Sequence, residues 1–179
     1  KYTDGDLRHR PVLGQRLFAG MEAAWKVTQR SRLEQVAART VPLPVPPRNE
    51  RGFTTEDFMR EIAEPAIPFS TKALNAMGLS WGGRPLDVPV VDFGHGKLLL
   101  LPGETFVQFQ LWAQALRPDQ FVLAAGYGDG AAGYIPTVTA TREGFDRRKR
   151  SIKTWMWCDP WKSEAVVRDA LRQCLSKET

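Results

Sequence analysis

Residues 96–127, "GKLLLLPGETFVQFQLWAQALRPDQFVLAAGY", decide the fold of this chain. They contain two apolar runs, the first ending at Pro102 and the second beginning at Phe121, with an amphipathic segment between them. At helical spacing, one face of that middle segment collects Phe106, Phe109, Ala113 and Leu116. Strand, helix and strand within about 30 residues form a βαβ unit, so we expect the two strands to be parallel.

A hairpin precedes this unit. In "VPVVDFGHGKLLLLPG", residues 88–103, two apolar runs flank a turn bounded by glycines, with His95 at its tip. A lone turn histidine is most often solvated, so we expect no catalytic or ligand role for His95. The fold class expected is α/β: a partial mixed sheet in which a β-hairpin leads into a parallel βαβ unit, flanked by helices.

The N-terminal part should add a helix and an extended segment. Residues 41–47, "VPLPVPP", are expected to form an edge strand or a connector, because prolines remove amide donors. Residues 13–30 predict a helix of about five turns, whose apolar face holds Leu13, Leu17, Met21, Ala24 and Val27.

Capping residues mark two short helices in the middle of the chain. Thr54 or Thr55 should cap the first, which opens with acidic residues. Ser70 should cap the second, and Gly78 and the pair Gly82–Gly83 should end it.

The last segment predicts a C-terminal helix, with Asp159 as N-cap and Pro160 at the first helical position. Cys158 and Cys174 would lie about 24 Å apart along it, too far for a disulfide. The buried face would hold Trp161, Val166, Ala170, Leu171 and Cys174.

Length and composition predict one domain with a substantial core. The chain has 179 residues, of which 42% are hydrophobic and 25% charged, which is ordinary for a soluble globular protein. No apolar run approaches the roughly 18 residues of a membrane span. The chain opens without Met or a signal segment, so we expect residues 1–179 to be a single partial domain of something longer, or a processed product.

A glycine-rich loop follows the second strand. Gly128, Gly130 and Gly133 satisfy the pattern G-x-G-x-x-G, which in dinucleotide-binding proteins lies between a strand and a helix. The residues after Gly133, "YIPTVTAT", are β-branched and include Pro136, so no helix is expected there. A nucleotide-binding domain is therefore the weakest functional hypothesis.

Parallel strands end at the same edge of a sheet, where open α/β sheets place their ligands. The first strand delivers Glu104 to this edge, and the second delivers Asp129 together with one or both of Tyr127 and Tyr134. These groups should converge on one crevice. On spacing alone, a functional Glu104 and an acid that merely stabilises a helix N-terminus are equally good interpretations.

Residues 98–137, "LLLLPGETFVQFQLWAQALRPDQFVLAAGYGDGAAGYIPT", resemble the neutral/alkaline, non-lysosomal ceramidase family, which carries an L-P-G-E segment, a helix, a strand and a G-Y-[IV]-x-T segment in this order. The resemblance implies the C-terminal part of a ceramidase-like catalytic domain, which hydrolyses the amide of a sphingolipid at a zinc ion. It also implies an exported or membrane-peripheral protein.

The resemblance assigns roles to particular residues. Glu104 matches the glutamate and Tyr134 the tyrosine that hold the family's zinc, with Gly133 and Phe145 beside the substrate. Phe145 stands where relatives carry a tyrosine, which puts ceramide itself in doubt. The family's two zinc histidines lie upstream of this sequence, and neither His9 nor His95 stands in a matching motif. We therefore expect this chain alone to bind zinc poorly or not at all and to be inactive.

A basic and aromatic stretch, "RRKRSIKTWMWCDPW", residues 147–161, is the last notable feature of a chain with net charge +5. An enzyme that draws lipid from a bilayer could place this stretch at the interface. The preferred alternative is that the tryptophans pack the last helix down and the charges are solvated. No nucleic-acid partner is expected. The interface candidates are Arg147, Arg148, Lys149, Trp155 and Trp157.

Three hypotheses therefore stand. The first is a ceramidase-like zinc hydrolase of an N-acyl amide in a lipid-like or related substrate, lacking the N-terminal segment of its own domain. The second is a non-catalytic scaffold or binding module that keeps the fold. The third is the nucleotide-binding domain.

Overall fold

The structure is a computed structural model that describes residues 6–30, 32–130, 132–145 and 155–176. It divides the chain into two compact units, residues 1–33 and residues 34–179. The first unit consists of the 3-10 helix η1 (Leu7–His9) and helix α1 (Arg10–Lys26). The prediction of this helix is confirmed, although it begins and ends earlier than expected, and its apolar side chains are exposed within the unit.

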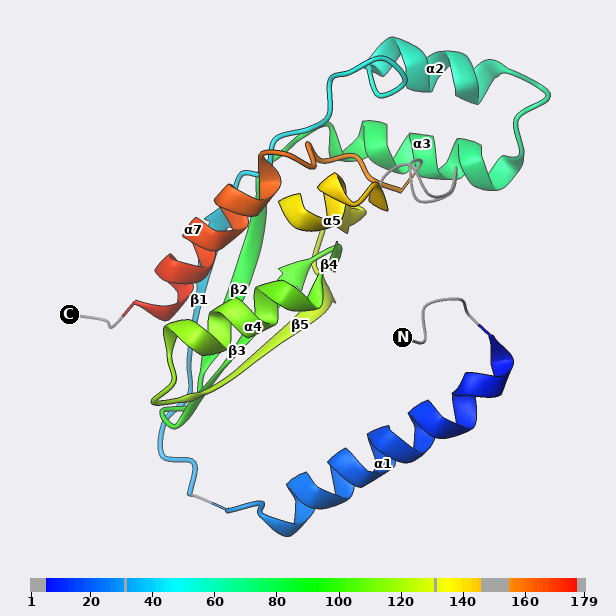
Figure 1. The fold of residues 1–179 in the computed structure, drawn as a ribbon. Coiled ribbons are helices and arrows are strands. Elements are labelled where there is room, and N and C mark those ends of the chain that lie inside the picture. The colour runs from blue at the N-terminus through cyan, green and yellow to red at the C-terminus, as the bar shows by residue number, and fades with distance from the viewer. Residues whose placement is uncertain (1–5, 31, 131, 146–154, 177–179) are drawn as a thin grey trace. The chain divides into compact units, whose positions relative to one another are not determined.

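The second unit is built on a four-stranded sheet in the order β1-β2-β3-β5 (Figure 1). The strands are β1 (Ala37–Leu43), β2 (Leu86–Asp92), β3 (Gly96–Pro102) and β5 (Phe121–Gly128). The strand pairs β1–β2 and β2–β3 are antiparallel, whereas β3 and β5 are parallel and joined by helix α4 (Val107–Leu116). The predicted hairpin and βαβ unit are thus confirmed. The edge strand β1 starts four residues before the expected extended segment and ends at Leu43.

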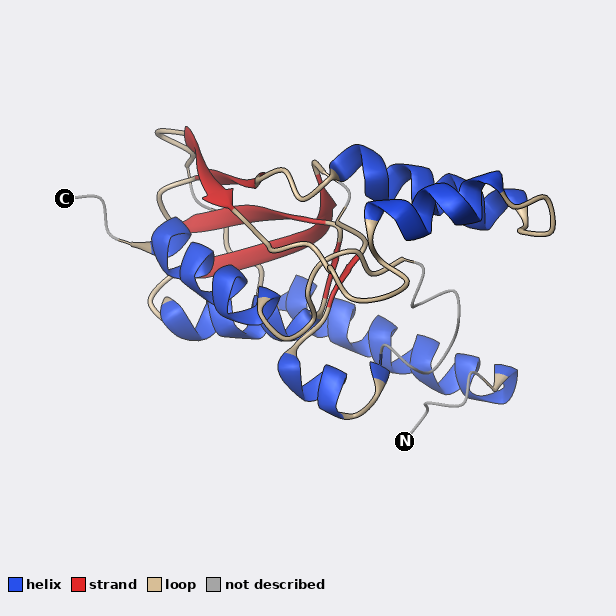
Figure 2. Ribbon diagram, turned by 90° about the horizontal axis from the view of Figure 1, so that it is seen from above, coloured by secondary structure: helices blue, strands red, loops and turns tan. Residues whose placement is uncertain are grey.

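One face of this sheet forms the core, and α4 and α7 (Ser163–Leu175) cover it, as Figures 1 and 2 show. Alternate strand residues point to this face, and registered partners such as Leu99 and Ala124 are both buried on it. The opposite face carries their neighbours, of which Leu123 is 42% and Phe121 69% exposed. Buried and exposed residues therefore alternate along the strand, as expected for a sheet that helices cover on one face.

Helices α2 (Thr55–Ala63) and α3 (Phe69–Trp81) form an antiparallel pair that projects from one end of the sheet (Figure 1). The cap at Thr54 is confirmed, because its hydroxyl accepts from the Asp57 N–H and the Asp57 carboxylate accepts from the Thr54 N–H. Ser70 was the wrong cap: α3 begins at Phe69 after Pro68. Gly78 was the wrong terminator, since α3 continues to Trp81 and ends at Gly82 in the left-handed conformation.

The start of α7 was also predicted wrongly. The Asp159 carboxylate accepts from the N–H groups of Trp161 and Lys162, so it caps a turn that precedes the helix, and α7 begins only at Ser163. Trp161 therefore lies outside the helix and is 51% exposed, so its place on the buried face was wrong. Ala170, Leu171 and Cys174 are buried as expected, together with Val167, and Val166 is half-buried. Cys158 and Cys174 are buried free thiols, as expected. In the described residues, no helix combines the length and apolarity needed to cross a membrane.

Candidate functional site

Two short strands hold the candidate site together. Strand β4 (Glu104–Thr105) follows β3, and strand β6 (Tyr134–Ile135) follows the glycine-rich loop, and the two pair in parallel. Glu104 lies directly opposite Tyr134 in this pairing, and the Glu104 N–H donates to the Gly133 carbonyl at 2.8 Å. The sequence prediction that these residues meet at one edge of the fold agrees with this register.

Glycine makes this pairing possible at two positions. Gly103 and Gly133 both have a left-handed backbone, with φ of 64° and 66°. A Cβ atom on Gly103 would lie 2.4 Å from the Gly133 carbonyl oxygen, and one on Gly133 would lie 1.8 Å from the Trp155 carbonyl oxygen. That Trp155 oxygen accepts the Tyr134 N–H at 2.8 Å. The glycines are thus needed because three backbone segments pass within contact distance of one another.

Tyr127 joins the same cluster from β5. It is the only described residue other than glycine with positive φ, 58°, a conformation that costs an L-residue about 1–2 kcal/mol. Its N–H donates to the Gly103 carbonyl at 2.8 Å, which stabilises the strained backbone. The residue is 75% exposed, and its hydroxyl lies close enough to the Glu104 carboxylate to be influenced by it.

The electrostatics of the cluster are dominated by the Glu104 carboxylate. Its hydrogen bond with the Tyr127 hydroxyl is the main reason that the pKa of Tyr127 is raised above the ordinary 10.0. Burial is the main reason that the pKa of Tyr134 is raised, followed by the charge of Glu104 and a hydrogen bond to it. Both phenols are therefore protonated at neutral pH, and only a cation close to them would reverse this preference.

An aromatic wall closes one side of the cluster. The Phe145 ring packs edge-to-face on Tyr134, with centroids 5.4 Å apart, and on Phe106, with centroids 4.7 Å apart. Phe145 and Gly133 thus both adjoin Tyr134, where the resemblance placed them beside a substrate. Phe106 was expected on the face of the helix. Its contact with Phe145 was not predicted, because that contact depends on the path of residues 138–145, which the local sequence around Phe106 does not indicate.

Other candidate residues lie away from the cluster. Asp129 is exposed in the loop after β5, and the charge that raises both tyrosine pKa values comes from Glu104 rather than from Asp129. His95 precedes β3 whereas Glu104 follows it, so the seven residues of that strand separate them, roughly 23 Å at about 3.3 Å per residue. His9 ends η1 in the first unit.

The described residues do not complete a zinc site. Within them, no group of three or more His, Cys, Asp or Glu side chains could hold a metal ion. The cluster offers one carboxylate and two phenols, whereas a catalytic zinc ion takes three protein ligands, mostly nitrogen or sulfur donors, plus water. Glu104 and Tyr134 fit part of such a donor set, and the nitrogen ligands would have to come from elsewhere.

The nucleotide hypothesis fails on the structure of the glycine loop. The expectation that no helix starts in "YIPTVTAT" was wrong, because α5 (Val138–Arg142) begins there after its N-cap Thr137. However, α5 has only five residues, the Thr137 hydroxyl accepts its Ala140 N–H, and the Glu164 carboxylate accepts its Val138 N–H. A carboxylate therefore already occupies the position where a phosphate would bind.

The membrane-interface candidates divide into two groups. Arg147, Arg148 and Lys149 lie outside the described residues. Trp157 is 2% exposed, so its assignment to an interface was wrong, and Trp155 is half-buried against it with ring centroids 5.0 Å apart. As the alternative expected, these two tryptophans pack inward, and Trp157 lies against Gly78 of α3.

Comparison with known proteins gives a fold but no family. No family model and no curated protein matches the sequence. The neutral ceramidase from Pseudomonas aeruginosa superposes with a TM-score of 0.51 at 15% identity, over 97% of this chain and 33% of that one. The fold is ceramidase-like.

A second solved structure, a ceramidase complexed with C2, gives the same TM-score of 0.51 at 17% identity, over 90% of this chain. In both comparisons this chain spans 33% of the length of the solved structure. In this chain β4 and β6 pair side by side, with Glu104 opposite Tyr134.

Proposed function

We propose that this chain is part of a zinc-dependent hydrolase that cleaves the N-acyl amide bond of a sphingolipid-like or related substrate. Glu104 and Tyr134 would be two of the zinc ligands. The observation that carries the proposal is the register of β4 and β6, which sets Glu104 directly opposite Tyr134. The ceramidase-like fold supports the choice of substrate class.

The roles of this chain's residues follow from the geometry. Glu104 and Tyr134 would supply oxygen donors from a backbone that Gly103 and Gly133 hold rigid. Zinc, when bound, lowers the pKa of its water to about 7 and so supplies hydroxide for attack on an amide carbonyl. Binding would require the Tyr134 proton to leave, since its phenol is protonated beside Glu104. Phe145 would present an apolar surface to the substrate.

The remaining ligands would be histidines outside this sequence, in the N-terminal part of the same domain. On this proposal the 179 residues alone bind zinc weakly and hydrolyse nothing. A lipid-like substrate also implies peripheral contact with a membrane. Of the interface candidates, Arg147, Arg148, Lys149 and Trp155 remain part of that proposal.

The test uses the complete coding sequence that contains these residues. Glu104→Gln and Tyr134→Phe should each lose stoichiometric zinc, measured by elemental mass spectrometry after dialysis. They should also lower hydrolysis of an N-acyl sphingosine by more than about 100-fold, since even outer-shell partners of zinc cost 10- to 100-fold. Glu143→Gln is the matched control, because this exposed carboxylate lies at the end of α5 and outside the cluster.

Two outcomes would overturn the proposal. If Glu104→Gln kept full zinc and normal turnover, Glu104 would not be a ligand. If the unmodified complete protein held no zinc and cleaved no amide, the scaffold hypothesis, in which the fold is kept without the chemistry, would replace it.

A further inference from the structure

The sheet of the second unit has one covered and one uncovered face. Helices α4 and α7 lie on the core face, and no helix described in the second unit lies over the opposite, outer face (Figure 2). The strand registers place Ala38, Val91, Leu98 and Leu123 in one row across all four strands of the outer face. Every member of this row is apolar, whereas a sheet face in contact with water is normally polar.

The rest of the outer face is nearly as apolar. Leu100 and Ala125 form a second registered pair beside the row, and Phe121 at the start of β5 is 69% exposed. Polar side chains on this face of the four strands lie toward β1, at Thr40 and at Asp87 of β2. The part of the face formed by β3 and β5 is therefore entirely apolar.

The strand sequences carry the same signal. Residues 98–101 of β3 are four consecutive leucines, and residues 121–125 of β5 read "FVLAA". A strand with one solvated face alternates apolar and polar residues, whereas a strand buried on both faces is a continuous apolar run. The strands β3 and β5 are also parallel, and parallel sheets occur almost only where both faces are covered. The outer face is therefore a surface of the kind that proteins bury.

A second copy of this chain does not fit as the cover. Four strands of seven or eight residues give a face of roughly 19 Å by 23 Å, about 440 Å², at ~4.8 Å between strands and ~3.3 Å per residue. A stable interface between separate proteins buries about 800 Å² on each partner. A segment of the same polypeptide needs less area, because it loses less translational freedom when it packs.

The fold comparison favours the same cover. The two ceramidase structures match 97% and 90% of this chain, whereas this chain spans 33% of each of them. Most of each solved structure therefore lies outside the match, and a fold of this kind has further chain available to cover the outer face.

We propose that the outer face is the docking surface for a further layer of the same polypeptide, formed by residues outside 1–179. This layer packs an apolar surface against the row from Ala38 to Leu123. The proposal shares with the zinc hydrolase proposal the premise of a longer polypeptide, but it needs neither zinc nor hydrolysis.

Cysteine labelling in the complete protein tests this cover. Ala38→Cys and Leu123→Cys place thiols at the two ends of the row, and Ala165→Cys, the matched control, places one at an exposed position of α7. The row thiols should react with N-ethylmaleimide at least about 100-fold more slowly in the folded protein than in urea, because access then requires local unfolding. The control thiol should be slowed by less than about tenfold. Mass spectrometry of the labelled peptides separates these sites from Cys158 and Cys174.

The 179-residue chain supplies the second comparison. Without the further layer, both row thiols should react within about tenfold of the control, because Leu123 is 42% exposed and Ala38 is exposed as well. Should Leu123→Cys not fold, Ala38→Cys, which adds a single sulfur atom, decides.

Three outcomes would overturn the proposal. The row thiols of the complete protein could react as fast as the control, which would mean that nothing covers the face. They could be equally protected in the 179-residue chain, which would place the cover within this chain. Protection that is lost on dilution would identify a second copy as the cover.

Repeating the labelling after zinc is removed with a chelator separates this proposal from the hydrolase proposal. A complete protein without zinc or activity whose row thiols stay protected would contradict the hydrolase proposal alone. A complete protein with zinc and turnover whose row thiols react freely would contradict the docking proposal alone.

Discussion

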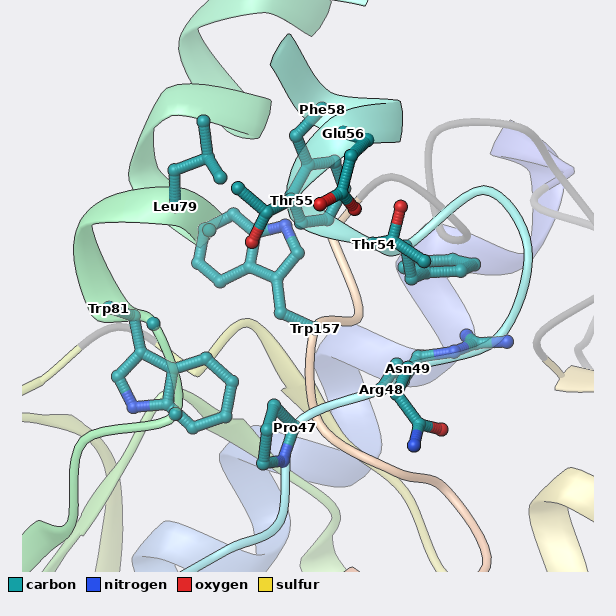
Figure 3. Close-up of a pocket in the computed structure, with 14 residues that line it drawn as sticks. Pro47, Arg48, Asn49, Thr54, Thr55, Glu56, Phe58, Leu79, Trp81 and Trp157 are labelled. Atoms are coloured by element: carbon teal, nitrogen blue, oxygen red, sulfur yellow. The ribbon is translucent and has the colours of Figure 1, made fainter.

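The Glu104–Tyr134 cluster and the α2–α3 cavity are built in opposite ways. The cavity is a space of about 330 Å³ where α2, α3 and the segment after β1 meet (Figure 3). Backbone atoms define the cluster, where Gly103, Gly133 and the Trp155 carbonyl pass within contact distance of each other. Side chains define the cavity, whose walls include aromatic rings from α2, α3 and the segment before α7. A backbone site tolerates no added atom, whereas a side-chain site can repack in part.

Residues 155–158 connect the two regions. The Trp155 carbonyl accepts the Tyr134 N–H on the cluster side, and the Trp157 carbonyl accepts the Arg48 N–H at 2.7 Å on the cavity side. Cys158 forms an isolated bridge with Pro47. The two regions therefore share a segment of the chain. They differ in that backbone atoms make the close contacts in the cluster, whereas side-chain atoms make them in the cavity.

Gly133→Ala should have the largest effect. A methyl group there would lie 1.8 Å from the Trp155 carbonyl oxygen, and φ is 66°, so we expect a loss of more than about 4 kcal/mol or no folding. Urea unfolding measures it. Gly144→Ala is the control, because φ is also positive but nothing lies within 4 Å, so only about 1–2 kcal/mol should be lost. Equal losses in both variants would show that conformation alone, and not close backbone contact, defines the cluster.

Gly78→Ala should have an intermediate effect. Its methyl group would lie 2.8 Å from the Trp157 indole, whose ring would have to shift, so we expect a loss of about 1–3 kcal/mol in the free energy of unfolding, measured by urea unfolding. Gly20→Ala, at an open position in α1, should instead stabilise its helix by about 0.5–1 kcal/mol, seen as greater helicity by circular dichroism. A neutral Gly78→Ala would mean that the indole moves freely and that the cavity is not preformed.

The titration of the two phenols should give the smallest effect. Tyr127 and Tyr134 both have raised pKa values, so the folded state holds these protons more tightly than the unfolded chain does. Their contribution to the free energy of unfolding is fully present below pH 10.0, the ordinary pKa of tyrosine. It is lost as the pH rises through the raised pKa values of the folded state. Ultraviolet titration in a Tyr2→Phe background isolates these two of the three tyrosines.

Glu104→Gln should lower both pKa values in that titration. The pKa should fall further for Tyr127 than for Tyr134. Glu104 is the main cause of the raised pKa of Tyr127, whereas burial is the main cause of the raised pKa of Tyr134. Tyr127→Phe and Tyr134→Phe assign the two steps. Unchanged pKa values in Glu104→Gln would show that the carboxylate does not contact the phenols.

The sheet was predictable because its signals are local. Apolar runs bounded by Gly and Pro gave β2, β3 and β5, and the helical face of residues 106–116 gave α4. Strand direction predicted that Glu104 would meet Tyr127, Tyr134 or both at one edge, and the family resemblance singled out Tyr134. The helix ends predicted at Ser70, Gly78 and Asp159 were wrong. A residue type that favours a cap shows that a helix can begin or end there, not that it does. Gly78 in particular lies inside a helix, where a side chain would collide with the ring of Trp157, 79 residues later in the sequence.

The sequence by itself determined the strand directions and the edge at which a carboxylate and a phenol meet, because periodicity and the parallel crossover leave few alternatives. Tertiary structure decided the left-handed Tyr127, the Phe145 wall and the α2–α3 cavity. Each of these depends on contacts between residues far apart in the chain. Such contacts arise from filling space at close-packed density, which no local pattern of residues encodes.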